Sequence, residues 1–265
     1  MKRIGWDHIL FRAINLLLIG FLLLPIGIVL LFAFNSAAFI VFPPEGFSLR
    51  WFKAFFIHPE FMRAFWLSLR LAATTVIIST VTGTMAAMAI VRGRIPGAKF
   101  ISALFLSPLM LPAIITGLAL FQFYVILDVG RTYTGLLIGH IIVTIPYVIR
   151  TTTALLYNFD GSVEEAARNL GAGELATFWY ITLPLIRPGV IAGSVFAFIV
   201  SFDQFPVSLF LVQPGINTLP IQLFNYLKYS FDPTVAAAAT VSIALSVTVV
   251  LLLERTIGLQ EYVKL

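Results

Sequence analysis

The chain has 265 residues, of which 60% are apolar and 11% are charged, and its mean hydropathy is +1.00. Soluble domains are about 45–50% apolar and about 25% charged, so the composition excludes an ordinary soluble protein and indicates an all-α membrane protein. The absence of cysteine excludes disulfides and thiolate metal sites, and the net charge of +5 fits basic cytoplasmic loops, with no nucleic-acid partner expected.

Six apolar stretches are candidates to cross the membrane, since a helical crossing takes about 20 mainly apolar residues. They are approximately 13–34, 67–91, 101–127, 135–149, 189–212 and 234–253. The fourth stretch is short, and we expect its helix to continue toward Leu156. Pro108 and Pro112 are expected to kink the third. The whole chain, 1–265, is expected to form a single transmembrane domain.

The basic residues indicate how the chain is oriented. With the N-terminus inside, eleven Lys and Arg side chains fall on the cytoplasmic side and five on the outer side. The positive-inside rule then predicts that both termini are cytoplasmic. It also places the polar loop 157–188 inside and the segments 35–62 and 213–233 outside. Segment 35–62, rich in Phe and Trp, could lie in the membrane interface or pack on the outer end of the helix bundle.

The loop 157–188 contains the most specific pattern in the sequence. It reads Glu165-Ala166-Ala167, three residues, Gly171, nine residues, and then Ile181-x-Leu183-Pro184. We call this segment the EAA loop.

The local residues of the EAA loop predict two short helices. Ser162-x-x-Glu165 has the capping-box form, so a helix is expected to begin at Ser162, and Gly171 is expected to end it in a left-handed conformation. A second short helix is expected at about 174–182. Pro184 and Pro188 are then expected to break the chain before the fifth span. Ala166 and Ala167 would give the first helix a low profile that can seat in a groove.

The loop pattern in a chain with several membrane spans resembles the type I ABC importer permeases, which are binding-protein-dependent, and the resemblance covers nearly the whole sequence. Within this family the chain resembles most the spermidine/putrescine permeases, in their second-subunit form. The residues that carry this closer resemblance are Phe34-Asn35-Ser36, His140 with Pro146-Tyr147, Ser201-Phe202-Asp203-Gln204 and Leu219-Pro220. The resemblance implies a permease fold of six transmembrane helices in the bacterial inner membrane.

The same resemblance implies the partners and the coupling residues. The chain would form half of a translocation pathway for a small polar, cationic solute. A cytoplasmic ABC ATPase dimer would bind ATP and Mg, with no cofactor on this chain. Further partners would be a second, homologous permease subunit as a heterodimer, an extracytoplasmic solute-binding protein and membrane lipid. The implied ATPase-coupling residues are Glu165, Ala166, Ala167, Gly171, Ile181, Leu183 and Pro184.

Asp203 is the only acidic residue inside a predicted span. A carboxylate costs at least about 2.5–3.5 kcal/mol at the centre of a membrane helix, so such residues usually face a bundle interior or a water-filled path. The candidate pathway residues are Asp203, Gln204, Phe202, Ser201 and His140. The alternative is that Asp203 bonds a neighbouring helix and that His140 packs between helices.

Other functions leave parts of the sequence unexplained. Gln204 stands where many polyamine permeases carry a second acidic residue, which keeps an amino acid, opine or phosphonate-like zwitterion open as the cargo. An ion-coupled secondary transporter would not need the EAA loop. A membrane-embedded enzyme would need a polar catalytic cluster, and we expect neither catalytic residues nor a metal site. There is no phosphate-loop motif, so ATP is not expected to bind this chain by that route.

Overall fold

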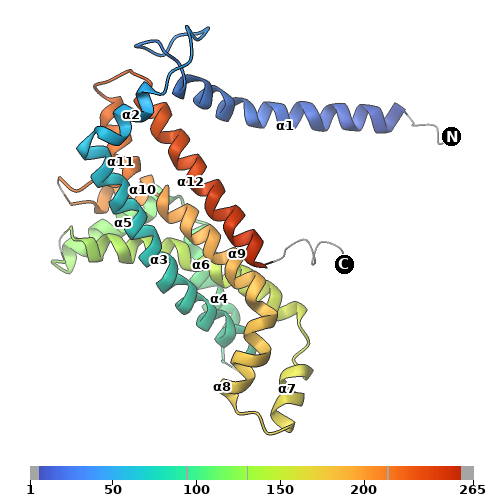
Figure 1. The fold of residues 1–265 in the computed structure, drawn as a ribbon. Helices are drawn as coiled ribbons and strands as arrows, with labels where there is room; N and C mark the ends of the chain where they lie inside the picture. The colour runs from blue at the N-terminus through green and yellow to red at the C-terminus, as the bar shows by residue number, and fades with distance from the viewer. Residues whose placement is uncertain (1–5, 94, 130, 214, 258–265) are drawn as a thin grey trace. The chain divides into compact units, whose positions relative to one another are not determined.

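The computed structural model describes residues 6–93, 95–129, 131–213 and 215–257, and these residues are almost entirely helical (Figure 1). Among these described residues, β-type backbone pairing is limited to one isolated antiparallel bridge between Asn35 and Phe47. The helical elements are α1 (Trp6–Ala33), α2 (Arg50–Ile57), α3 (Pro59–Arg92), α4 (Ala98–Leu106), η1 (Ser107–Leu109), α5 (Ala113–Ile126), α6 (Tyr133–Asn158), α7 (Ser162–Asn169), α8 (Glu174–Thr177), η2 (Phe178–Thr182), α9 (Leu183–Phe202), α10 (Phe205–Leu211), α11 (Leu219–Leu227) and α12 (Thr234–Ile257).

Five helices among the described residues are long and apolar enough to cross a membrane, and the count is six when one bent pair of helices is taken as a single crossing. This pair is Ala98–Leu109 and Ala113–Ile126, with a bend of 104° between them. Pro108 and Pro112 lie at this bend, as expected, because proline lacks the amide hydrogen that would continue a helix. The long helices are Leu10–Ala33, Pro59–Arg92, Tyr133–Asn158, Glu174–Phe202 and Thr234–Leu252. The all-α membrane fold expected from composition is therefore confirmed.

The chain divides into two compact units, and the first comprises Met1–Met62 with Leu223–Leu245. Its connecting segment is held by Asn35, whose side-chain oxygen accepts hydrogen bonds from the amides of Ala37 and Glu45. The Trp51 indole donates to the Asn35 carbonyl at 2.9 Å. Phe55 on α2 is fully buried, whereas Phe47 is 91% exposed. Segment 35–62 is therefore partly packed and partly an exposed apolar surface.

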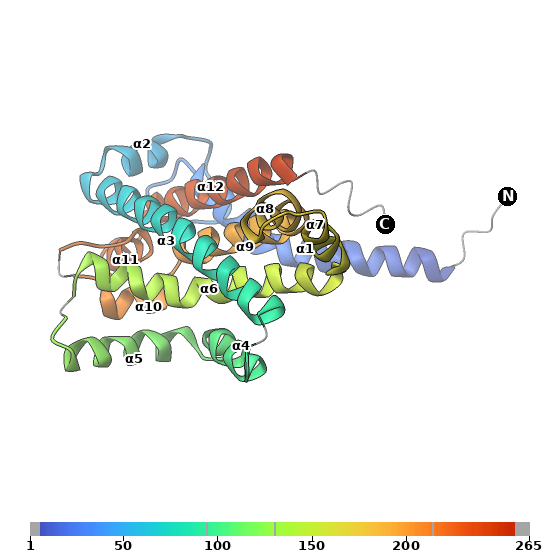
Figure 2. The same ribbon diagram turned by 90° about the horizontal axis from the view of Figure 1, so that it is seen from below.

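The second unit comprises Arg63–Gln222 with Ser246–Leu265, and α6 and α9 pack along one another in it. Small residues allow this close approach, since a Cβ added at Gly189 would lie 2.7 Å from the Thr151 carbonyl oxygen. Hydroxyl pairs tie α3 to both helices: Ser79 to Thr144 at 2.8 Å and Thr80 to Ser194 at 2.7 Å. Helix α10 lies against α5 and α6 (Figure 2).

The helix of the fifth span corrects the expected break at Pro184 and Pro188. Residues Glu174–Phe202 form one helical segment of 29 residues that runs through both prolines. A π-helical turn, η2, lies directly before α9, and Pro184 falls in the first turn of α9. The π-helical turn changes the backbone hydrogen-bond pattern just before Pro184, and a proline in the first turn of a helix leaves no necessary hydrogen bond unmade. The helix therefore continues through this residue.

The outer end of that helix also differs from the predicted span 189–212. Helix α9 ends at Phe202, and α10 begins at Phe205 with Pro206 in its first turn. Asp203 and Gln204 form the break between the two helices. Proline is favoured in a first turn because its missing amide hydrogen has no partner there anyway, so the sequence restarts the helix at this point.

Candidate functional site

Helix α7 of the EAA loop begins at Ser162, as the sequence predicts, but it is not held by a capping box. The residue before it is Gly161, and no side chain caps the helix. Instead Asp160 closes the preceding turn, because its carboxylate accepts hydrogen bonds from the Ser162 amide at 3.0 Å and the Ser162 hydroxyl at 2.8 Å. These bonds to the charged form, the amide bond first, lower the pKa of Asp160. The expected capping box is therefore wrong, although the helix start is confirmed.

Helix α7 ends as Gly171 predicts. Gly171 has φ +91°, in the left-handed region that glycine tolerates best. Its amide donates to the Arg168 carbonyl, and the Ala172 amide donates to the Ala167 carbonyl, both at 3.0 Å. This is the Schellman pattern, which satisfies the last carbonyls of a helix and turns the chain sharply.

Glu164, the neighbour of the motif residue Glu165, fixes the loop to the membrane helices. Glu164 is 5% exposed, and its Oε2 lies 2.9 Å from Nε of Arg92 at the end of α3. The hydroxyl of Thr182, in η2, donates to Glu164 Oε1 at 2.7 Å. Arg92 also donates to the Phe159 carbonyl at 3.2 Å. One carboxylate therefore joins α7 to both α3 and η2, at the end of α6 and α9 where α7 and α8 lie (Figure 1).

The motif residues divide into an exposed group and a packed group. Glu165, Ala166 and Gly171 are exposed, and Ala167 is partly buried. Ile181 and Leu183 are partly buried and Pro184 is exposed, with Leu183 packed against a buried apolar cluster that includes Leu156 and Ile186. The exposed group of α7 continues in Leu170, which is 89% exposed. The sequence pattern alone does not single out Glu164, since a pair of adjacent acidic residues does not show which one faces the protein.

Among the five pathway candidates, only Asp203 is exposed. It caps the end of α9, with its amide bonded to the Ile199 carbonyl. Ser201, Phe202, Gln204 and His140 are each no more than 8% exposed.

His140 bridges the helices on both sides of the Asp203 break. Its Nδ1 lies 2.9 Å from the Ser201 hydroxyl on α9, and its Nε2 lies 3.0 Å from the Ser208 hydroxyl on α10. Phe202 stacks on Phe198, with ring centroids 5.9 Å apart. These contacts favour the packing interpretation of His140. Across residues 6–93, 95–129, 131–213 and 215–257, no group of three or more His, Cys, Asp or Glu side chains is placed to hold a metal ion.

Comparison with known proteins agrees with this architecture. The family model described as "Binding-protein-dependent transport system inner membrane component" matches residues 79–258. The chain is 32% identical over 232 residues to the spermidine/putrescine transport system permease protein PotC of Escherichia coli (strain K12), covering 88% of each chain. It is 34% identical over 236 residues to the putrescine transport system permease protein PotI of the same strain, covering 86% of this chain and 84% of PotI.

Solved structures share the fold at lower identity. A bacterial ABC transporter involved in import of the acidic polysaccharide alginate has a chain that superposes with a TM-score of 0.70 at 19% identity, covering 96% of this chain and 99% of that one. A chain of an amino acid ABC transporter gives a TM-score of 0.62 at 18% identity, over 80% and 99% of the two chains. The match of the family model over most of the spans, together with these relatives, establishes that the chain belongs to the inner membrane components of binding-protein-dependent transport systems and is an ABC importer permease subunit.

Proposed function

We propose that this permease forms half of a translocation pathway for a polyamine and that Asp203 is the group that attracts the cationic cargo. Support comes from the PotC and PotI relatives, whose names give spermidine and putrescine as cargo, and from the exposed carboxylate at the α9–α10 break. Primary amines have an ordinary pKa near 10.4, so polyamines are multiply positive at neutral pH. At about 4 Å and an effective dielectric constant of about 20, a carboxylate and an ammonium attract by about 4 kcal/mol.

Asp203 is suited to this role because it stands at a break in the helix. The helix break frees the side chain from the close α6–α9 packing, and Gln204 beside it is turned inward at 8% exposure. The buried bridge from Ser201 through His140 to Ser208 holds the two helix ends on either side of the carboxylate. A fixed carboxylate loses little conformational freedom when a cation arrives, which favours binding.

The EAA loop is proposed to couple the pathway to a cytoplasmic ABC ATPase dimer that binds ATP and Mg, with no cofactor on this chain. The exposed residues Glu165, Ala166 and Gly171, together with the partly buried Ala167, would seat in a groove of the ATPase. The ion pair of Glu164 with Arg92 and its bond to Thr182 would carry the motion of α7 directly into α3 and α9. Alternation between outward-open and inward-open states then follows, because ATP binding favours one of two conformations.

The resemblance to importer permeases also supports a proposed membrane orientation and two further partner chains. Both termini and the EAA loop would be cytoplasmic. A second, homologous permease would complete the pathway as a heterodimer, and an extracytoplasmic solute-binding protein would deliver the cargo.

The test of the cargo is ATP-driven uptake by the complete transporter in proteoliposomes, with labelled putrescine and its binding protein. Asp203→Asn should lower putrescine uptake at least tenfold while leaving assembly with the ATPase unchanged. Asp203→Glu, which keeps the charge, should retain most of the uptake. Equal uptake by wild type and Asp203→Asn would refute the cation-reading role. Uptake of an uncharged or zwitterionic solute in place of putrescine would refute the polyamine assignment.

A further inference from the structure

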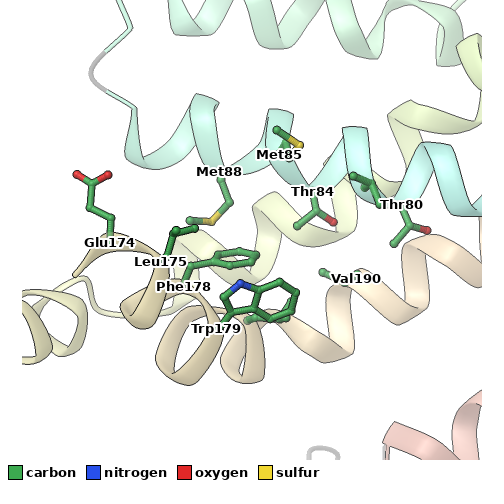
Figure 3. A pocket seen from close by; sticks show the side chains of 11 residues that line it. Thr80, Thr84, Met85, Met88, Glu174, Leu175, Phe178, Trp179 and Val190 are labelled. Carbon is green, nitrogen blue, oxygen red and sulfur yellow. The ribbon is translucent and has the colours of Figure 1, made fainter. Parts of the chain in front are cut away.

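Two adjoining cavities lie where the membrane helices of the second unit meet the EAA loop. The larger is a groove of about 740 Å³ between α3 on one side and α8, η2 and α9 on the other (Figure 3). Its apolar walls include Val81, Met85, Met88, Leu175, Phe178 and Trp179. The smaller cavity, of about 270 Å³, shares Met88, Glu174 and Phe178 with the groove. A mainly apolar groove therefore adjoins a cavity with charged and polar lining residues.

The small cavity presents one positive and one negative side chain that form no ion pair within the described part of the chain. Arg92 and Glu164 line it but form an ion pair with each other. Arg168 and Glu174 also line it, and neither makes an ion pair with another described residue. These charges are the complement of a zwitterion.

Thr177 adds a third polar group to the small cavity. It is 5% exposed, and its hydroxyl has no hydrogen-bond partner within the part of the chain that the structure describes. Buried hydroxyls normally have a hydrogen-bond partner, so the Thr177 hydroxyl is available to donate to a group bound in the small cavity.

The groove has the length and the lining of a site for an acyl chain. Along α3 it runs from Thr80 to Met88, which is ~12 Å at 1.5 Å per residue, against ~15 Å for half of the hydrocarbon core. In Figure 3, Met88 points toward Phe178, and Glu174 lies at the opposite end from Thr80. Methionine side chains adapt to an irregular chain, and tryptophan is enriched at the membrane interface.

We propose that the groove and the small cavity together bind one zwitterionic phospholipid with an ethanolamine headgroup, from the leaflet on the side of the EAA loop. One acyl chain lies between α3 and η2–α9, the phosphate meets Arg168 and the Thr177 hydroxyl, and the ammonium meets Glu174. A free zwitterion of similar charge would fill the polar cavity but leave the groove empty, so the lipid accounts for both. The bound lipid touches α7 beside the Glu164–Arg92 pair. The proposal is independent of the cargo.

The experiment is native mass spectrometry of the assembled transporter after delipidation, with phosphatidylethanolamine or phosphatidylglycerol of matched acyl chains added back. Wild type should retain one phosphatidylethanolamine. Val81→Trp, which fills the groove, should reduce its occupancy at least tenfold. Ile77→Trp is the matched control: it lies one turn away on α3, its side chain is 65% exposed against 55% for Val81, and it does not line the groove. This control should bind lipid as wild type does.

A second variant tests the headgroup without altering the fold, since Glu174 is exposed. Glu174→Gln removes the anion that meets the ammonium, so the preference for phosphatidylethanolamine over phosphatidylglycerol should disappear. Equal retention by Val81→Trp and wild type, or an unchanged preference in Glu174→Gln, would overturn the proposal. Loss of the second permease instead of lipid in Val81→Trp would overturn it by making the groove a subunit interface. Full displacement of the lipid by free phosphoethanolamine would also overturn it, because the ligand of the small cavity would then be a soluble zwitterion.

Discussion

At the scale of single residues, the two adjacent glutamates of α7 have opposite environments. Successive residues of a helix point about 100° apart, so Glu164 faces Arg92 and Thr182 while Glu165 faces outward. A carboxylate that is 5% exposed is stable only with partners, and Glu164 has both an ion pair and a hydroxyl donor. We therefore assign Glu164 to the internal connection of the loop and Glu165 to its outer surface.

Glu164→Gln should lower the free energy of unfolding by about 1–3 kcal/mol, because it leaves the Arg92 guanidinium without its charge partner. The loss is smaller than the about 3–5 kcal/mol of a fully buried pair, since the Arg92 side chain is 27% exposed. The measurement is thermal unfolding of the detergent-solubilised transporter, followed by tryptophan fluorescence. Glu165→Gln, the adjacent control, should change stability by less than about 0.5 kcal/mol. An equal decrease in the free energy of unfolding in both variants would show that the ion pair with Arg92 does not make Glu164 more important for stability than Glu165.

At the scale of elements, the EAA loop is a sharp turn between two helices that are anchored at different points. The Schellman turn at Gly171 ends α7, and Glu174 begins the helical segment that continues to Phe202. Because η2 carries Thr182 and leads directly into α9, no flexible linker separates the loop from the membrane helix. A force on α7 therefore acts directly on α9.

Gly171→Ala should weaken coupling, because an alanine at φ +91° costs roughly 1–2 kcal/mol and would shift the turn. A Cβ at Gly171 meets no atom within 4 Å, so the backbone angle alone causes the effect. Gly173→Ala is the matched control: it also has open space, but its φ is −69°. The readouts are recovery of the ATPase subunit and uptake per inserted permease. We expect both to fall in Gly171→Ala and to remain in Gly173→Ala, and the same result for both glycines would contradict the argument.

Local signals predict part of this site, and long-range contacts determine the rest. The left-handed end of α7 follows from Gly171, and its start at Ser162 is held by the neighbouring Asp160, so both are local effects that act within one turn of helix. The passage of the helix through Pro184 depends on the π-helical turn before it, which no spacing rule indicates. The partners of His140 lie 61 and 68 residues away, on two helices whose break the apolar run 189–212 conceals. The rotation of α7 that selects Glu164 is likewise set by Arg92, far away in sequence.

At the scale of the whole molecule, the proposed function assigns the energy supply and the cargo delivery to other chains. The sequence has no phosphate-loop motif, and the loop that resembles an ATPase contact presents small, exposed side chains. A helix face of small side chains that packs into a groove tolerates few larger side chains, because overpacking of a close contact is destabilising. This makes the exposed face of α7 the place where assembly can be tested without disturbing the membrane helices.

Purification of the tagged chain from native membranes should recover an ABC ATPase, a second permease and a solute-binding protein, identified by mass spectrometry of the co-purifying chains. Ala166→Trp should reduce recovery of the ATPase at least tenfold and leave the second permease in place, because Ala166 lies on the exposed face of α7 and does not belong to a buried cluster. Tyr229→Trp, an aromatic exchange at a side chain that is 86% exposed in segment 213–233, should leave all partners bound. Full ATPase recovery with Ala166→Trp would place the ATPase contact elsewhere, and transport by the isolated chain without ATP would contradict the coupling role of the EAA loop.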